Sequence, residues 1–316
     1  MNRHLVNPTS RCRSVWTRSA ALFAFASSAF ALLSISGCSA GEPKVDAPLD
    51  PADSATGDTT SAGETGAPPD GGIQIDGSLP DAEAGPTQPS EVWAHSSDTL
   101  YKLDPDSKAV TVIGPFSGCS GVVDIALDEN SNLYASAGGI FKIDKTTAKC
   151  TSVGGGSFAG NSLSFVPVGV LDPVKEVMVT YNGGQYMRVD IGSGTTTNLG
   201  NLPDGYGSSG DIVSVKGGGT YLSAYGPGCT NDCLLQVDPK TGTMIKNWGQ
   251  LGSGGVWGLA FWAGSVYAFD SGGRIWQVTF GKDTITTKEI PIKDRPAGLS
   301  FWGAGSTTTA PLKPPT

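Results

Sequence analysis

The sequence predicts an all-β fold: a single β-propeller of five four-stranded blades, closed by pairing of the C-terminal strand with the N-terminal blade. Three observations support this prediction. Glycine accounts for 45 of the 316 residues, no stretch shows a capped apolar period of 3.6 residues, and one strand–turn–strand motif recurs at the length of a propeller blade. We expect residues 91–305 to form the propeller and residues 306–316 to form an unstructured tail.

The N-terminus resembles a lipoprotein signal peptide over residues 1–37. Four arginines precede the apolar run Ala20–Ser36, which leads into Ile35-Ser36-Gly37-Cys38. This ending resembles a bacterial lipobox, which implies cleavage before Cys38 and acylation of that cysteine. By the same resemblance, Ser39 implies the outer membrane rather than the inner one. A plain signal peptide with Cys38 unmodified and an uncleaved anchor are the alternatives.

Residues 38–90 are expected to form a disordered tether between the lipid and the propeller. They contain ten acidic residues, one lysine and no aromatic residue, so they cannot bury enough apolar surface to offset the entropy of ordering. The whole chain has a formal net charge of −8, although residues 1–37 hold four arginines and no acid. This acidic balance argues against a nucleic-acid partner, which requires a basic surface.

The folded part consists of a repeat in which a strand ends in Asp, a turn with Thr or Gly follows, and a second strand closes on Gly. Four copies are clear and begin at Leu100, Ile140, Tyr186 and Leu234, whereas a fifth, at Arg274–Thr279, lacks the Asp. Their spacing of about 40 to 48 residues is the length of a four-stranded blade rather than of a helical repeat. A sixth blade, merged with another in this count, is the alternative.

Ring closure follows from the two ends of the repeat region. The run Ala297–Gly305 resembles the inner strand Val256–Gly264 but has no blade after it, and the first strands, from Glu91, have no inner strand before them. We therefore expect the C-terminal strand to complete the N-terminal blade, which also removes the exposed sheet edges.

The pattern L-Y-x-[IL]-D-x-x-[ST]-[KG] resembles the repeats of bacterial surface and periplasmic propellers, in the broad group with NHL-type and YVTN-type repeats. The resemblance covers about residues 91–305 and implies the fold rather than an activity.

The cysteines are typical of an exported protein. Cys12 leaves with the signal peptide, and Cys38 is the expected site of the lipid. Cys229 and Cys233 share one loop, where a disulfide is expected, and a Cys119–Cys150 disulfide follows by elimination. A zinc site at Cys229 and Cys233 is disfavoured because no histidine is near, so no metal site is expected.

Ligands of propellers most often lie over the central channel, at the starts of the inner strands. The predicted starts are Val123-Asp124, Asn161-Ser162, Gly210-Asp211, Trp257-Gly258 and Ala297-Gly298. One hypothesis is that a polar ligand or cation binds there, with Trp257 stacking on a sugar or another ring; its residues are Asp124, Asn161, Asp211, Trp257 and Arg295. The alternative is that Asp124 and Asp211 accept hydrogen bonds from backbone amides, while Trp257 fills the centre of the ring.

Other polar motifs have structural interpretations. The repeated aspartates (Asp104, Asp144, Asp190 and Asp238) are expected to form Asx turns rather than bind metal. Asp128-Glu-Asn-Ser-Asn132 lacks the later residues of a calcium loop and predicts a hairpin turn. Trp248 lies ten residues after Asp238, unlike the spacing of quinoprotein propellers, so no cofactor is expected. His95 is expected to be structural.

We therefore expect a membrane-anchored, monomeric binding or interaction module at the bacterial cell envelope, with a glycan or an envelope protein as partner and no assigned catalytic residue. The alternative is a propeller hydrolase of the glycosidase or lactonase type that uses channel carboxylates, with or without a divalent cation. It is disfavoured because none of the four glutamates between residues 91 and 316 lies at a predicted strand start.

Overall fold

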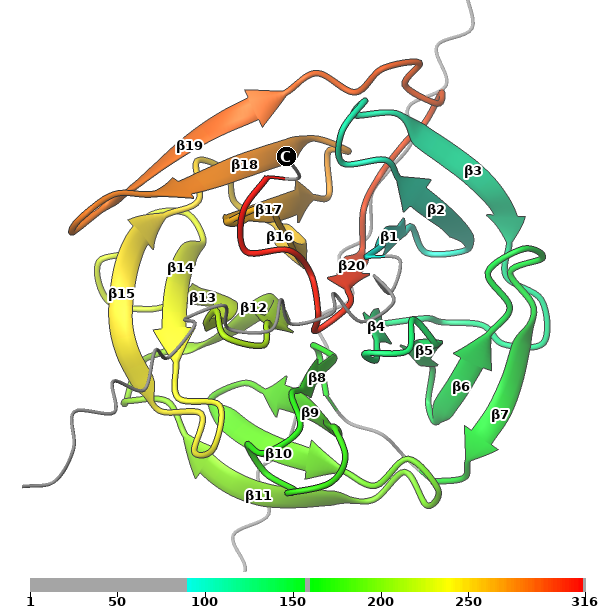
Figure 1. Ribbon diagram of the computed structural model, residues 1–316, viewed down its shortest axis with the longest axis horizontal. Helices are drawn as coiled ribbons and strands as arrows, with labels where there is room; N and C mark the ends of the chain where they lie inside the picture. Colours follow the sequence, from blue (N-terminus) through cyan, green and yellow to red (C-terminus); the bar gives the residue numbers. More distant parts are fainter. Residues whose placement is uncertain (1–89, 157–159, 315–316) are drawn as a thin grey trace, which may run out of the picture. The chain divides into compact units, whose positions relative to one another are not determined.

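The computed structural model describes residues 90–156 and 160–314, which form five four-stranded antiparallel sheets around a central axis (Figure 1). The predicted fold class, an all-β propeller of five blades, is confirmed. The signal peptide, Cys38 and the tether as far as residue 89 lie outside the described residues. Within those residues, we find no helix with the length and apolar character needed to cross a membrane.

Each blade runs outward from an inner strand at the channel to an outer strand at the rim. Blade 1 contains β20 (Gly303–Ser306), β1 (Val92–His95), β2 (Thr99–Leu103) and β3 (Val110–Pro115). Blade 2 contains β4 (Asp124–Leu127), β5 (Leu133–Ser136), β6 (Ile140–Ile143) and β7 (Cys150–Gly154). Blade 3 contains β8 (Ser164–Val166), β9 (Val177–Asn182), β10 (Gln185–Val189) and β11 (Thr196–Asn201). Blade 4 contains β12 (Gly207–Ser214), β13 (Thr220–Tyr225), β14 (Cys233–Val237) and β15 (Met244–Gln250). Blade 5 contains β16 (Val256–Trp262), β17 (Ser265–Asp270), β18 (Ile275–Phe280) and β19 (Ile285–Ile290).

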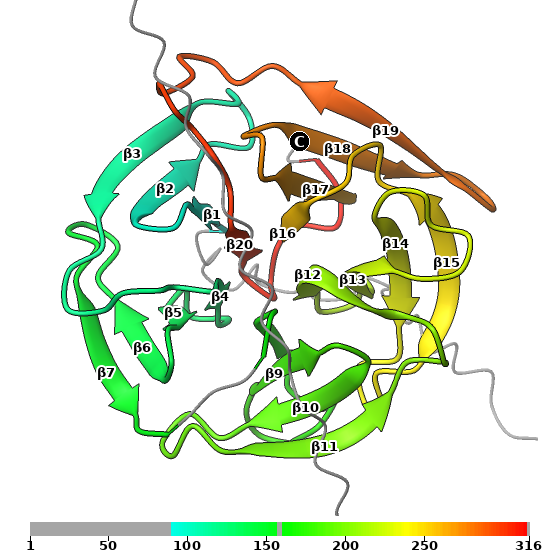
Figure 2. The ribbon, with the colours of Figure 1, turned by 180° about the vertical axis from the view of Figure 1, so that it is seen from behind.

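The ring closes as predicted, through antiparallel pairing of the last strand with the first. In this pairing Val92 lies opposite Ser306 and His95 lies opposite Gly303. Figure 2, seen from behind, shows β20 beside β1 at the centre of the ring. Blade 1 is therefore built from both ends of the propeller, so that β1 pairs on both of its edges, with β2 and β20, instead of being left as an edge strand.

The position of the closing strand differs from the sequence prediction. The inner strand begins at Gly303, not near Ala297, so Trp302-Gly303 occupies the place that Trp257-Gly258 occupies in blade 5. Ala297 and Gly298 lie in the loop before β20. The tail expected to be unstructured from residue 306 also differs: Ser306 ends β20, and Thr307, Thr308 and Ala310 are buried.

Glycine on the inner strands allows five blades to meet closely at the axis. A Cβ on Gly210 would lie 2.4 Å from the carbonyl oxygen of Val256, and a Cβ on Gly258 would lie 2.7 Å from the amide nitrogen of Ala304. Both neighbours are backbone atoms of the next inner strand, which cannot move aside as the end of a flexible side chain can. Larger side chains fill the spaces between blades, as where Trp93 and Leu100 of blade 1 pack with Ile125 and Leu133 of blade 2.

The repeated aspartates form turns between the third and fourth strands of their blades. Oδ1 of Asp144 accepts hydrogen bonds from the amides of Thr146 (2.9 Å) and Thr147 (2.8 Å), and these bonds hold the pKa of Asp144 below its ordinary value. Asp104, Asp190 and Asp238 accept equivalent bonds. Oδ1 of Asp128 likewise accepts bonds from the amides of Asn130 and Asn132 in the β4–β5 hairpin. The prediction of turns rather than metal sites is consistent with this geometry.

Both predicted disulfides are present. Cys119 is bonded to Cys150 and Cys229 to Cys233, each with a Cα–Cα distance of 5.6 Å, within the usual range for a disulfide. The first bond joins the segment before β4 to β7 of the same blade. The second closes a short loop between β13 and β14.

Candidate ligand-binding site at the mouth of the channel

Equivalent positions at the starts of the five inner strands form two stacked rings. The first, which we call the mouth ring, consists of Val123, Asn161, Gly210, Trp257 and Trp302. The second ring consists of the residue that follows each of these: Asp124, Ser162, Asp211, Gly258 and Gly303. The mouth ring is partly open to solvent, whereas every member of the second ring is buried. The second ring is therefore the floor beneath the mouth ring.

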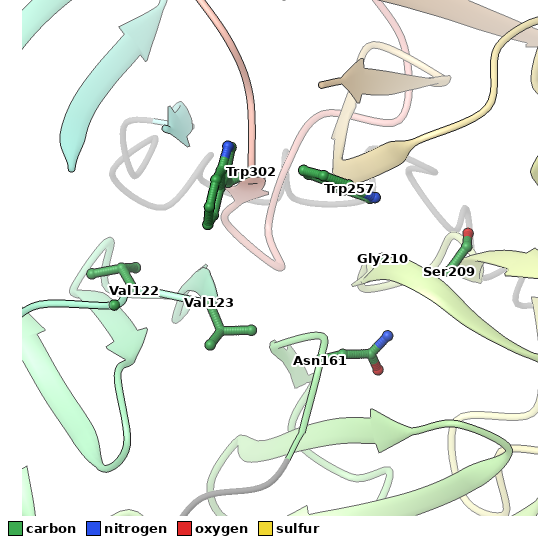
Figure 3. Close-up of a pocket in the computed structure, with 8 residues that line it drawn as sticks. Val122, Val123, Asn161, Ser209, Gly210, Trp257 and Trp302 are labelled. Carbon is green, nitrogen blue, oxygen red and sulfur yellow. The ribbon is translucent and has the colours of Figure 1, made fainter. Parts of the chain in front are cut away.

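A pocket of about 260 Å³ opens at the mouth ring (Figure 3). It is lined by all five mouth-ring residues together with Gly121, Val122 and Ser209. Every blade contributes to it through its inner strand or the segment before that strand. None of the lining side chains carries a charge.

Two tryptophans dominate one side of the pocket. Trp257 is 37% exposed and Trp302 is 43% exposed, although indole is among the side chains that gain most from burial. Their ring centroids are 5.9 Å apart and the ring planes meet at 84°, so the indoles form a corner rather than a stack. Figure 3 shows this pair on one side and Val123 and Asn161 on the other. A ligand in this corner could contact both aromatic rings.

Blades 3 and 4 each contribute one polar side chain to the lining of the pocket, Asn161 and Ser209. Nδ2 of Asn161 donates a 3.0 Å hydrogen bond to the carbonyl oxygen of Ser208, which fixes the orientation of the amide. Oδ1 of Asn161 is buried and has no hydrogen-bond partner. The hydroxyl of Ser209 lies beside the Asp232 carboxylate but makes no hydrogen bond of good geometry. An unpartnered buried acceptor costs free energy.

The carboxylates of the second ring are bound to backbone amides. Asp124 accepts hydrogen bonds from its neighbour Ile125 (2.9 Å) and from Leu163 of blade 3 (2.7 Å). Asp211 accepts them from Ile212 (2.6 Å) and from Leu259 of blade 5 (2.6 Å). Each aspartate thus ties its own inner strand to that of the following blade.

Both carboxyl groups are fully buried and they interact with each other. Burial raises the pKa of Asp211 to about 8, and burial together with the nearby Asp211 raises the pKa of Asp124 well above its ordinary value. The pair therefore keeps at least one proton at neutral pH, which removes the cost of two buried charges side by side.

His95 completes the floor next to Gly303. Its ring is fully buried, its Nδ1 lies 2.7 Å from the carbonyl oxygen of Ser96, and its Nε2 has no hydrogen-bond partner. Burial lowers the pKa of His95 to about 4, so the ring is neutral at pH 7. A Cβ on Gly303 would lie 2.2 Å from Oδ1 of Asp124 and 2.4 Å from His95 Nε2. Only glycine fits between these two groups.

The structure brings together some of the residues expected at the site and separates others. Asn161 and Trp257 line the pocket, whereas Asp124 and Asp211 lie beneath it. Arg295 is exposed in the loop before β20, where its guanidinium donates a 2.9 Å hydrogen bond to the carbonyl oxygen of Gly272. Trp302 is not among the predicted site residues, because the predicted last inner strand begins too early; the shared Trp-Gly pairs at 257–258 and 302–303 are the signal that identifies it.

Within residues 90–156 and 160–314, no group of three or more His, Cys, Asp and Glu side chains is arranged to hold a metal ion.

Comparison with known proteins identifies similar folds and no family. No family model matches the chain, and no curated protein matches it. A solved structure of a protein of unknown function from Bacteroides caccae is 12% identical, with a TM-score of 0.37, and the match covers 67% of this chain and 77% of that one. BamB from Moraxella catarrhalis is 14% identical, with a TM-score of 0.33, and the match covers 63% of each chain. A symmetrical protein, whose de novo evolutionary emergence was shaped by folding constraints, is 17% identical, with a TM-score of 0.37. The match covers 68% of this chain and 93% of that one. These similarities concern the fold alone.

Proposed function

We propose that this protein is a lipid-anchored binding module of the bacterial cell envelope, and that its propeller binds a ligand in the pocket at the mouth of the channel. The observation that carries the proposal is the pair of half-exposed tryptophans, Trp257 and Trp302, set at a right angle over a buried polar floor. A concave, mostly apolar site with a few fixed polar groups is the usual form of a small-molecule site.

The envelope location rests on the lipobox-like sequence at Cys38 and is supported by the two disulfides, which form in oxidising compartments. The acidic segment up to residue 90 serves as a spacer that holds the propeller away from the membrane surface. Labelled fatty acid should be incorporated into the full chain and not into a Cys38→Ser variant. Equal labelling of both would overturn the anchor, and a labelled protein that fractionates with the inner membrane would overturn the outer-membrane location.

Binding is favoured over hydrolysis by the state of the carboxyl groups. A glycosidase needs two carboxyl groups that reach the substrate, one as acid and one as base or nucleophile. Asp124 and Asp211 instead lie under the mouth ring, do not line the pocket, and accept hydrogen bonds from two backbone amides each. Their geometry is that of groups that hold the inner strands together.

Ligand-induced stabilisation of the full chain tests the binding function. A ligand at 100 times its Kd stabilises the folded state by about 2.7 kcal/mol, which corresponds to a rise in Tm of roughly 5–10 °C for a domain of this size. Soluble envelope glycan fragments and small aromatic compounds are suitable probes. We expect a shift that is lost in Trp257→Ala and retained in Tyr225→Ala, since Tyr225 is an exposed aromatic residue of blade 4 outside the pocket. A shift retained in both variants would place the ligand elsewhere.

A further inference from the structure

The pocket has the size of a single ring. Its volume of about 260 Å³ lies just below the roughly 300–1,000 Å³ that sites for drug-sized ligands occupy. The five inner strands fix this volume, because their backbones already approach one another closely at Gly210 and Gly258. The pocket therefore selects the terminal residue of a larger ligand or a free small molecule.

The residues that line the pocket favour a ring that has both an apolar face and hydrogen-bonding groups. The indoles of Trp257 and Trp302 and the side chain of Val123 offer apolar contact. Asn161 adds a side-chain amide to this lining, and a ligand without hydrogen-bonding groups would give that amide no polar partner in the pocket. A hydroxylated aliphatic ring meets both demands, since its C–H face packs on indole while a hydroxyl forms a hydrogen bond with the amide.

The lack of charged residues around the pocket disfavours ionic ligands. None of the eight lining residues is charged, so neither an anion nor a cation finds a counter-charge on the walls. An anion would also lie above the carboxyl groups of Asp124 and Asp211, with no counter-charge to compensate for the hydration that it loses. The guest is therefore neutral.

Resting on the proposed binding function, we infer that the pocket binds a single uncharged pyranose residue, held in the indole corner of Trp257 and Trp302 and hydrogen-bonded to the side-chain amide of Asn161. A free monosaccharide and the non-reducing end of a glycan share this chemistry. If a methyl pyranoside binds and a disaccharide binds with no higher affinity, the site holds one residue. If the disaccharide does not bind, the site takes free sugars only.

The test is tryptophan fluorescence and calorimetric titration of the full chain with methyl glucoside, galactoside, mannoside and N-acetylglucosaminide. Glucuronate is the anionic probe, and indole is the aromatic probe. We expect at least one neutral pyranoside to bind, and to bind about tenfold or more tightly than glucuronate. Trp302→Ala should weaken that binding by about tenfold or more, because an aromatic contact and its buried area are lost. Asn161→Ala should weaken it as well, and Tyr225→Ala should leave it unchanged.

The outcomes separate this inference from the proposed function. Indole binding that depends on Trp257 and Trp302, with no response to any pyranoside, would overturn the sugar inference and leave the pocket as a binding site. Pyranoside binding that persists in both tryptophan variants would overturn the assignment of this pocket to the sugar. Absence of any Trp-dependent binding, with every variant folded by circular dichroism, would overturn both.

Discussion

The carboxyl group of Asp211 accepts a 2.6 Å hydrogen bond from the backbone amide of Leu259 and thereby joins the inner strands of blades 4 and 5. Asp124 joins blades 2 and 3 in the same way, through the amide of Leu163. These two acidic side chains therefore link neighbouring blades near the axis, whereas β1 and β20 are linked by backbone pairing. The cost of burying them is reduced by the proton that the pair retains.

Replacement of Asp211 by asparagine should destabilise the protein in a pH-dependent way. An Asp211→Asn side chain has one carbonyl oxygen for two amides, so one hydrogen bond is lost, at a cost of about 1–3 kcal/mol. Because the folded-state pKa of Asp211 is raised to about 8, its contribution is fully present below the unfolded pKa and is lost as pH rises toward 8. The difference in unfolding free energy between wild type and variant should therefore shrink from pH 4 to pH 8.

Urea denaturation at several pH values measures this difference, with Asp283→Asn, an exposed replacement, as the control. A difference that grows with pH would show that the carboxyl group is ionised and stabilised by charge, contrary to the raised pKa.

The floor of the pocket should not tolerate a side chain at Gly303. A Cβ there would lie within 2.4 Å of both Asp124 Oδ1 and His95 Nε2. Asp124 Oδ1 is held by the hydrogen bond from the amide of Ile125, and the His95 ring is held by the contact of its Nδ1 with the carbonyl oxygen of Ser96. We expect Gly303→Ala to reduce the unfolding free energy by about 1–3 kcal/mol, the usual cost of overpacking. Gly155→Ala is the matched control, since its Cβ would meet no atom within 4 Å. Equal stability of the two variants in thermal unfolding would contradict the close packing.

The sequence predicted the blades better than it predicted the site, for a physical reason. Each blade carries its own local signal, because the Asx turn at a residue such as Asp144 depends only on amides two and three positions later. The position of Trp302 depends instead on ring closure. A local match between two Trp-containing runs placed the last strand too early, whereas the contacts of Gly303 with Asp124 and His95 fix its register in three dimensions.

The role of the aspartates could be stated from sequence only as one of two alternatives. Asp124 and Asp211 sit at equivalent strand starts, which is compatible both with a ligand site and with amide acceptors. The choice depends on where Leu163 and Leu259 of the neighbouring blades lie, and no sequence pattern specifies that distance.

Removal of the two disulfides should have unequal effects. The Cys119–Cys150 bond spans 31 residues of sequence and the Cys229–Cys233 bond spans 4. Under the chain-entropy description, the longer loop contributes about 3–4 kcal/mol and the shorter about 2 kcal/mol. A Cys119→Ser, Cys150→Ser double variant should therefore lower the Tm more than the corresponding Cys229→Ser, Cys233→Ser variant. The reverse order in calorimetry would show that local strain, rather than loop entropy, determines their contribution.

Glu91 should stabilise the protein with the pH dependence opposite to that of Asp211. It joins blades 1 and 2, because Lys102 donates a 2.9 Å hydrogen bond to Oε1 while Lys145 and Ser131 donate to Oε2. Burial acts to raise the pKa of Glu91, but these three donors outweigh it and lower the pKa to about 2. The contribution of Glu91 is therefore present above the unfolded pKa and is lost as pH falls from about 4.5 to 2.

At pH 7, Glu91→Gln should reduce the unfolding free energy by about 1–2 kcal/mol, a value kept small because both lysines are partly exposed and solvent screens the ion pairs. Glu289→Gln on β19, at an exposed position, is the control and should change little. Denaturant titrations at pH 7 and near pH 2 should show the Glu91→Gln difference disappear at the lower pH. If the difference were the same at both pH values, the loss would come from packing at the blade 1–blade 2 junction rather than from the ionised carboxylate.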